Sequence, residues 1–433
     1  MREVLEGSHA VSEAVRLAKV QVMSAYPITP QTHIVEALSE FCAEGKMDAR
    51  FICVESEHSA MAAVIGAACG GVRTFTASSS QGLALMHELL HWASAGRLPI
   101  VMAEVNRALG PGWNIWMDQT DSLAQRDTGW IQLYCEDAQE VLDTTLQAFR
   151  LAESINLPVM VVLDAFFLSH TYEPVDVPDQ DTVDKFLPPL NPKIRLDTSN
   201  PFALYQMAPP TVYMEMRHDI QMAMEQVSGH FDKIENEFES IFGRRYGAAD
   251  AFCCEDAEII MVMAGTAAST CRQLVNDLRA KGEKIGLIKL KMFRPFPKEL
   301  FRKMLGNAKK VAVVDRNFSF GASGIFAQEI RAAMYNHSDQ PSDYNLHPLE
   351  EINKTKFNFQ DQGQIISQLI LFYTYIQQDN LKFSKSGDKI LLTSIKQMCD
   401  YCKIKEFYDE KDNNLRFIRT KLIADLLLDI KKE

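Results

Sequence analysis

The chain has 433 residues, of which 47% are hydrophobic and 24% are charged, and its net charge is −12. This composition excludes a disordered chain, and the lack of clustered Lys and Arg argues against a nucleic-acid-binding surface. The length favours two or three domains. Because no stretch approaches the roughly 20 apolar residues that span a bilayer and the N-terminus lacks a signal peptide, we expect a cytoplasmic protein.

Short apolar runs alternate with helical patterns in the first 165 residues. Runs of this kind between helices indicate βαβ units, so the sequence predicts an α/β fold with a buried parallel sheet. The strands are expected at residues 20–26, 50–54, 72–78, 98–105, 131–135 and 159–165.

The pattern changes after residue 170. A proline-rich run followed by a long polar helix over 213–243 predicts a linker and a helical arm from about 171, which complete a first domain over 1–235. A second, smaller α/β domain is expected over 253–340. Its alternating units begin with strands at 257–265, 284–293 and 309–321.

Residues 346–433 differ in composition from the rest, with one alanine and two glycines. They predict a divergent, mostly helical tail with no assigned role. Cys399 and Cys402 form the only CxxC of the chain. Because no second pair stands at a workable spacing, we assign no metal to it, and we expect the nine cysteines to be reduced thiols.

In an open parallel sheet, ligands collect at the carboxyl ends of the strands. The loops there carry the unusual polar residues Thr29, Glu57 and Arg107. Each also has a structural explanation. Thr29 fits a helix N-cap with Pro30 at the first helical position, Glu57 suits the positive end of a helix dipole, and a solvated arginine is common at a strand end.

Several familiar catalytic motifs are absent. The sequence has no GxGxxG after a strand, no GxxxxGK[ST] and no GxSxG. Nicotinamide, nucleoside triphosphate and serine hydrolase chemistry therefore lack their usual sequence support.

Four segments of the first domain resemble the alpha subunit of the pyruvate:ferredoxin and related 2-oxoacid:ferredoxin oxidoreductases. They are "AYPITPQTHIVEALSEF", "VESEHSAMAAVIGAACGGVRTFTASSSQGLALM", "LPIVMAEVNRA" and "NIWMDQTDSLAQRDTGWIQLYCEDAQEVLDTTLQAFRLAE". In the second domain, "KMFRPFP" and "VAVVDRNFSFGASG" are similar to that subunit's C-terminal domain. The resemblance covers about three quarters of the chain. It implies a pyrimidine-binding-type domain for thiamine diphosphate, followed by a transketolase C-terminal-like domain.

The resemblance also implies an activity and its partners. The family oxidatively decarboxylates a 2-oxoacid such as pyruvate with CoA, forming acetyl-CoA and CO2 and reducing ferredoxin. Its alpha subunit grips the pyrimidine end of thiamine diphosphate, while a beta subunit holds the diphosphate and magnesium. Iron–sulfur clusters lie on partner subunits, including ferredoxin-like gamma and delta subunits. This division agrees with the absence here of a GDG…NN motif and of a ferredoxin-type cysteine run.

Three site residues carry over from the family's motifs. The glutamate of the family's SE motif falls on Glu57, which the resemblance places against the pyrimidine nitrogen of the cofactor. The threonine of YPITP falls on Thr29 and the arginine of the NRA motif on Arg107, and both would bind the substrate. Thr29 could also cap its helix at the same time.

The resemblance leaves substrate and role partly open. "NIWMDQTD" is similar to the pyruvate enzymes (pyruvate synthases), but "GPGW" at 110–113 departs from their pattern, so 2-oxoisovalerate and arylglyoxylate enzymes stay alternatives. A non-catalytic scaffold subunit and a thiamine-dependent non-oxidative decarboxylase are further alternatives. The tail after 345 replaces the family's usual glycine-rich end, which leaves its contacts with partner subunits open.

Overall fold

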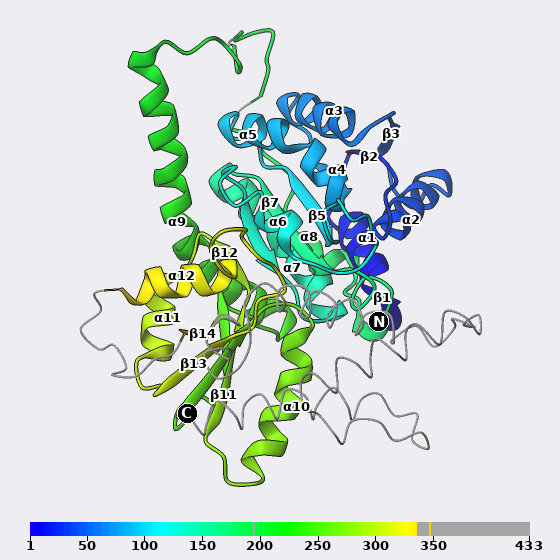
Figure 1. Ribbon diagram of the computed structural model, residues 1–433. Helices are drawn as coiled ribbons and strands as arrows, with labels where there is room; N and C mark the ends of the chain where they lie inside the picture. The colour runs from blue at the N-terminus through cyan, green and yellow to red at the C-terminus, as the bar shows by residue number, and fades with distance from the viewer. Residues whose placement is uncertain (194, 202, 336–345, 348–433) are drawn as a thin grey trace.

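The structure is a computed structural model that describes residues 1–193, 195–201, 203–335 and 346–347 (Figure 1). Apart from Leu346–His347, the expected tail over 346–433, with Cys399 and Cys402, lies outside the described residues. Within the described part, no helix is long and apolar enough to cross a membrane. The cytoplasmic location expected from the sequence stays a prediction.

A seven-stranded sheet organises the first half of the chain, in the order β12-β6-β7-β5-β4-β2-β3. Every pairing among the six strands that this sheet takes from the first 165 residues is parallel, which confirms the α/β fold. The runs of β4 to β7 are apolar because both faces of the sheet are covered there, whereas most of the edge strand β3 is exposed. The strands are β2 (Val22–Ala25), β3 (Arg50–Cys53), β4 (Thr74–Ser78), β5 (Val101–Asn106), β6 (Ile131–Tyr134), β7 (Val159–Asp164) and the antiparallel β12 (Met292–Arg294).

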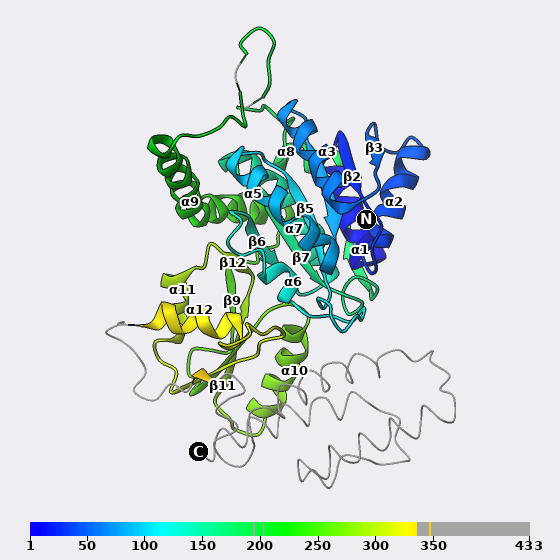
Figure 2. The ribbon, with the colours of Figure 1, turned by 45° about the horizontal axis from the view of Figure 1, so that its top comes forward.

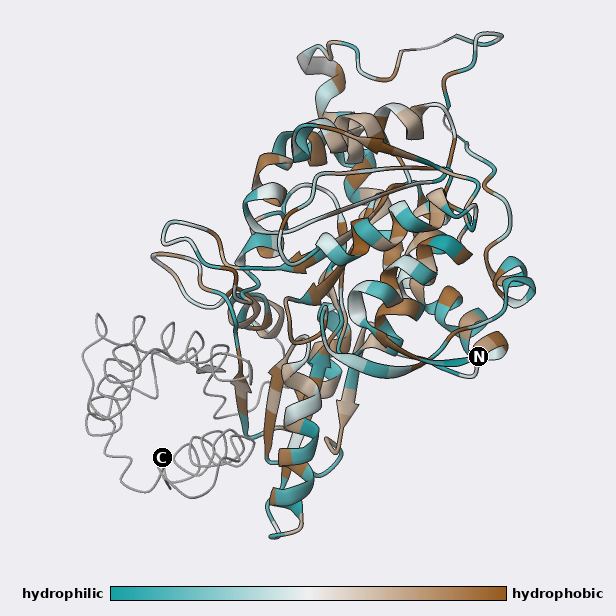
Figure 3. Cartoon of the chain, turned by 90° about the vertical axis from the view of Figure 1, so that its right-hand side faces the viewer, coloured by the Kyte–Doolittle hydropathy of each residue, from teal (hydrophilic) through white to brown (hydrophobic). Residues whose placement is uncertain are grey.

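Helices pack on both faces of this sheet, and Figure 3 shows apolar residues gathered on the strands between them. One face of the sheet forms a hydrophobic core with α1 (Gly7–Leu17), α2 (Thr32–Ala43) and α7 (Ala138–Ile155). The other face packs against α3 (Glu57–Cys69), α4 (Ser80–Leu85), α5 (His87–Ala95) and the short α6 (Thr120–Leu123).

The segment expected to be a linker and arm is more structured than its prolines suggested. It contains β8 (Tyr172–Asp176), which pairs antiparallel with β1 (Arg2–Glu6), and the helix α8 (Gln180–Phe186). The long helix is present as α9 (Pro210–Phe242), and its N-terminal end projects from the body of the molecule (Figures 1 and 2). Its C-terminal part is no free arm, because Val227, Phe231 and Phe238 are fully buried in the core that α7 also lines.

A second sheet of five strands has the order β14-β13-β10-β11-β9. Its strand β9 begins at Ala249, before the expected boundary at 253, and runs antiparallel to β11. The division into two domains stays a proposal, with the start of the second domain moved from residue 253 to Ala249. The elements are β9 (Ala249–Phe252), β10 (Ile259–Met263), α10 (Ala267–Arg279), β11 (Ile285–Leu290), α11 (Lys298–Leu305), β13 (Lys310–Val313), α12 (Ile325–Met334) and β14 (Leu346–His347).

The single strand predicted over 284–293 is wrong, because the chain leaves one sheet at Lys291 and enters the other. β11 ends at Leu290 in the second sheet, and β12 begins at Met292 in the first. Lys291 is fully buried, and its ammonium lies 3.0 Å from Glu140 and donates to Thr144 at 2.7 Å. An apolar run with interspersed lysines does not reveal such a crossing between sheets.

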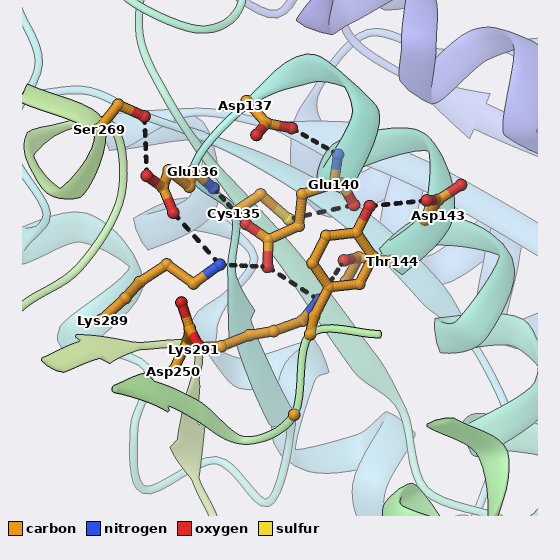
Figure 4. Close-up of polar contacts among 12 residues, drawn as sticks. Cys135, Glu136, Asp137, Glu140, Asp143, Thr144, Asp250, Ser269, Lys289 and Lys291 are labelled. Carbon is orange, nitrogen blue, oxygen red and sulfur yellow. Dashed lines mark hydrogen bonds and ion pairs between the residues drawn. The ribbon is translucent and has the colours of Figure 1, made fainter. Parts of the chain in front are cut away.

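Lys291 belongs to a buried charge cluster between the two sheets, drawn in Figure 4. Lys289 lies 2.9 Å from Glu140 and 3.3 Å from Glu136, which also accepts from Arg272 at 2.9 Å. Burial opposes the ionisation of Glu140, but the charges of Lys291 and Lys289 outweigh it and lower the pKa of Glu140 to about 2. The cluster therefore joins α7 to the second sheet through paired charges.

Candidate functional site

The three site residues expected from the sequence follow neighbouring strands. Thr29 follows β2, Glu57 follows β3 and Arg107 follows β5, while β4 lies between β2 and β5 in the sheet. Because these strands are parallel, their carboxyl ends meet at one edge. The structure therefore brings all three residues to the edge where open α/β sheets bind ligands.

Glu57 is the first residue of α3, and only 7% of it is exposed. The helix starts here because Ser56 caps it, accepting from the backbone N–H of Ser59 at 3.2 Å, and the carboxylate lies in the first turn where the helix dipole favours it. The Glu57 carboxylate makes no hydrogen bond or ion pair with any described residue. A buried carboxylate without a protein partner is ready to accept a hydrogen bond from a ligand.

Gly82 of α4 forms the wall beside this carboxylate. A Cβ at Gly82 would lie 2.5 Å from Glu57 Oε1 and 2.8 Å from its Cδ. The absence of a side chain at Gly82 therefore lets the carboxylate lie against the backbone of α4. Sequence reasoning did not single out Gly82, since nothing distinguishes it there from a glycine of a loop.

Arg107 is 4% exposed, so the structural explanation of a solvated arginine at the strand end is wrong. Its guanidinium donates to the Thr29 carbonyl at 2.7 Å, to the Asn114 carbonyl at 3.0 Å and to Gln81 Oε1 at 3.3 Å. Trp113, which is 75% exposed, has its ring centroid 5.9 Å from the guanidinium carbon. Burial lowers the pKa of Arg107, and the nearby Asp121 charge opposes this shift. Gln81 and Trp113 are site residues whose roles the sequence did not reveal.

Thr29 does not cap its helix, contrary to the prediction. α2 begins at Thr32, and Gln31 occupies the cap position. Thr29 and Pro30 instead form the middle of a turn that the Gln31 N–H closes by donating to the Ile28 carbonyl at 2.9 Å. The Thr29 side chain is exposed, and its hydroxyl makes no hydrogen bond with any described residue. The hydroxyl is thus available to a ligand.

Gln31 holds this turn from inside the protein, a role that no sequence motif indicates. Its side-chain amide is fully buried and donates to the Tyr26 carbonyl and to the Ala77 carbonyl, both at 3.0 Å. The turn that carries Thr29 is therefore tied to the end of β4.

The described part of the chain contains no group of three or more His, Cys, Asp or Glu side chains that could hold a metal ion. Its cysteines are free thiols, namely Cys42, Cys53, Cys69, Cys135, Cys253, Cys254 and Cys271.

Comparisons with known proteins agree with this architecture. Residues 13–236 match the thiamine diphosphate-binding domain of pyruvate flavodoxin/ferredoxin oxidoreductase, and residues 257–354 match core domain II of pyruvate:ferredoxin oxidoreductase. The 2-oxoglutarate:ferredoxin oxidoreductase from Magnetococcus marinus has a similar fold, with a TM-score of 0.59 and 21% identity, over 82% of this chain and 65% of that chain.

Two curated relatives are similar along most of their length. The ketoisovalerate oxidoreductase subunit VorA of Pyrococcus abyssi is 49% identical over 343 residues, which cover 79% of this chain and 87% of that protein. The pyruvate synthase subunit PorA of Methanothermobacter thermautotrophicus is 48% identical over 334 residues, covering 77% of this chain and 87% of that protein. The chain therefore belongs to the 2-oxoacid:ferredoxin oxidoreductase family, in which it corresponds to the PorA and VorA subunits.

Proposed function

We propose that this chain is the alpha subunit of a pyruvate:ferredoxin oxidoreductase and supplies one half of its catalytic site. The assembled enzyme would oxidatively decarboxylate pyruvate with CoA, forming acetyl-CoA and CO2 and passing electrons to ferredoxin. The observation that carries the proposal is the Glu57 carboxylate, which is buried at the ligand-binding edge of the sheet and has no partner among the described residues.

Glu57 fits the pyrimidine ring of thiamine diphosphate. A buried carboxylate is costly unless a donor satisfies it, and a protonated ring nitrogen provides such a donor. Thiamine diphosphate, when bound, supplies the nucleophilic carbon and the electron sink for decarboxylation. Glu57 would accept a hydrogen bond from the protonated ring nitrogen and would thereby control the protonation state of the ring from a buried position.

Arg107 and Thr29 would bind the 2-oxoacid. Arg107 brings a buried positive charge to the same edge, and the contact with Gln81, at 3.3 Å, is the longest of the three hydrogen bonds that its guanidinium donates. We infer that the substrate carboxylate takes the place of this weaker contact, because a guanidinium binds an oppositely charged carboxylate more strongly than the neutral amide oxygen of Gln81. The free Thr29 hydroxyl would donate to the substrate's keto oxygen.

A beta subunit would cover this edge and carry the diphosphate and magnesium, while iron–sulfur clusters would lie on gamma and delta subunits. Four large apolar side chains support a partner surface because they are exposed on the elements that surround the site. They are Tyr26, Ile52, Leu85 and Trp113.

One alternative substrate has an observation in its favour. The relative named for ketoisovalerate is 49% identical, and the relative named for pyruvate is 48% identical, so overall similarity does not separate the two. An enzyme for branched 2-oxoacids therefore stays the second candidate, with the same residues in the same roles.

The test is to purify the native complex and to measure CoA-dependent viologen reduction with pyruvate, 2-oxoisovalerate and phenylglyoxylate. We expect pyruvate to give the highest kcat/KM. Glu57→Gln should lower kcat at least a hundredfold without preventing assembly, in line with the size of acid–base contributions. Glu55→Gln, which changes an exposed carboxylate two residues away, is the matched control. Turnover of Glu57→Gln close to wild type would contradict the proposal.

A further inference from the structure

One carboxylate joins the two loops that build the candidate site. Asp121 of α6 is fully buried, and its Oδ2 accepts from the backbone N–H of Ser80 at 2.9 Å and of Arg107 at 2.8 Å. Its Oδ1 accepts from the Asn106 amide at 2.6 Å and from the Ser122 N–H at 2.8 Å. All four donors depend on both oxygens being acceptors, which only an ionised carboxylate provides.

The two loops tied by Asp121 carry the functional groups. Ser80 has a φ of +50°, a left-handed conformation that is unfavourable for a residue with a side chain unless its surroundings hold it there. It begins α4, two residues before the glycine that lies against Glu57. The Ser80 hydroxyl also donates to the Ala108 carbonyl at 2.6 Å, next to Arg107. Asp121 thus sets the backbone on both sides of the site.

The side chains that face Asp121 explain its charge. Glu104 of β5 and Arg107 lie beside it, and Tyr134 of β6 shares a 2.8 Å hydrogen bond with the neighbouring Ser122. Burial raises the pKa of Glu104 well above its usual range, with the Asp121 charge adding to the effect, so Glu104 is the neutral member of the pair. Burial also raises the pKa of Asp121, to about 6, against the hydrogen bonds that it accepts.

We propose that Asp121 is a positioning residue for the reaction, whose ionised carboxylate fixes Arg107 and the α4 backbone beside Glu57 in their working places. This inference rests on the proposed function of the Glu57 site. Asp121 acts through the two loops. An ionised carboxylate suits this buried position because the four donors around it need two acceptor oxygens.

The principal test is Asp121→Asn in the purified complex. The amide has one acceptor oxygen, so its NH2 group must face two N–H donors, and we expect kcat to fall at least tenfold while the complex still assembles. In wild type, kcat should also fall as the pH drops through about 6, since protonated Asp121 loses an acceptor. The residual activity of Asp121→Asn should lack this acid limb.

A matched control is Asp315→Asn, which changes another buried carboxylate. Asp315 accepts from the backbone N–H groups of Phe326 at 2.8 Å and Ala327 at 3.1 Å, at the start of α12. This variant should lose stability but keep the acid limb of kcat. If Asp121→Asn does not assemble, Asn106→Ser takes its place: loss of one donor to Asp121 should move the acid limb to higher pH, and an unmoved limb contradicts the inference.

Amide hydrogen exchange provides a readout without turnover. In Asp121→Asn, peptides that contain Ser80 and Arg107 should exchange faster than in wild type, and unchanged exchange would contradict the positioning role. If the wild-type complex fails to reduce viologen with every 2-oxoacid tested, this result would count against the proposed function alone. If the wild-type complex is active and the kcat of Asp121→Asn stays within twofold of the wild-type value, this result would count against the inference alone.

Discussion

The Glu57 carboxylate lies so close to Gly82 that a Cβ at position 82 would come within 2.5 Å of its Oε1. The chain leaves no room there for any side chain, because the same Cβ would lie 2.8 Å from both Cγ and Cδ of Glu57. α4 therefore determines where the carboxylate points.

Gly82→Ala should displace the Glu57 carboxylate while leaving α4 intact, because alanine is a better helix former than glycine. We expect a fall in kcat of about tenfold or more, since a misplacement of about 1 Å costs on that order. Steady-state kinetics of the complex measure this. Gly66→Ala is the control, because a Cβ on that helical glycine meets nothing within 4 Å. Equal losses in the two variants would show that Gly82 affects only the fold.

Arg107→Ala should raise the KM for the 2-oxoacid more than it lowers kcat, because it removes a charge that binds the substrate before and during the reaction. An increase of at least tenfold is expected, assayed with the preferred substrate at several concentrations. Arg126→Ala, which removes a partly exposed arginine on the chain after α6, serves as the comparison. The role assigned to Arg107 would be wrong if its variant assembled and kept the wild-type KM.

Lys291→Met should destabilise the protein by about 3 kcal/mol, because it leaves part of a buried charge cluster unpaired. Lys46→Met removes one partner of an exposed pair with Glu44 and should leave the free energy of unfolding nearly unchanged, because exposed ion pairs contribute little. Denaturant unfolding of both variants gives the comparison. Similar losses for the two lysines would indicate that the charges between the sheets contribute little.

Acid should weaken the same cluster. The pKa of Glu140 is lowered from 4.5 to about 2, so its ionised form stabilises the fold above pH 4.5, and this contribution is lost as the pH falls toward 2. Glu140→Gln should lack this part of the pH dependence, although it is less stable at neutral pH. Thermal unfolding between pH 5 and pH 2.5 measures the difference. A wild-type curve with the same slope as the variant would refute the assignment.

Much of the fold follows from the sequence because its signals are local. The six parallel strands coincide with apolar runs, and α9 coincides with the long polar helix predicted over 213–243. The exceptions depend on distant partners. Lys291 lies between β11 in one sheet and β12 in the other, and its charge meets Glu140 from α7. The strand β1 has its partner in β8, far along the chain.

The candidate site shows the same limit. Thr29, Glu57 and Arg107 could be placed at one edge because each follows a strand of the parallel sheet. The capping role of Thr29 could not be judged, since the turn is set by Gln31 reaching to β4. No sequence pattern assigns a role to Asp121, and only the folded structure shows its four donors.

The most direct measurement is an experimental structure of the assembled complex with thiamine diphosphate bound. We predict a Glu57 carboxylate oxygen about 2.5–3.0 Å from a pyrimidine nitrogen of the cofactor, with the diphosphate and its metal contacted by another subunit. A map in which Glu57 faces away from the ring, or in which this chain alone holds the diphosphate, would contradict the account.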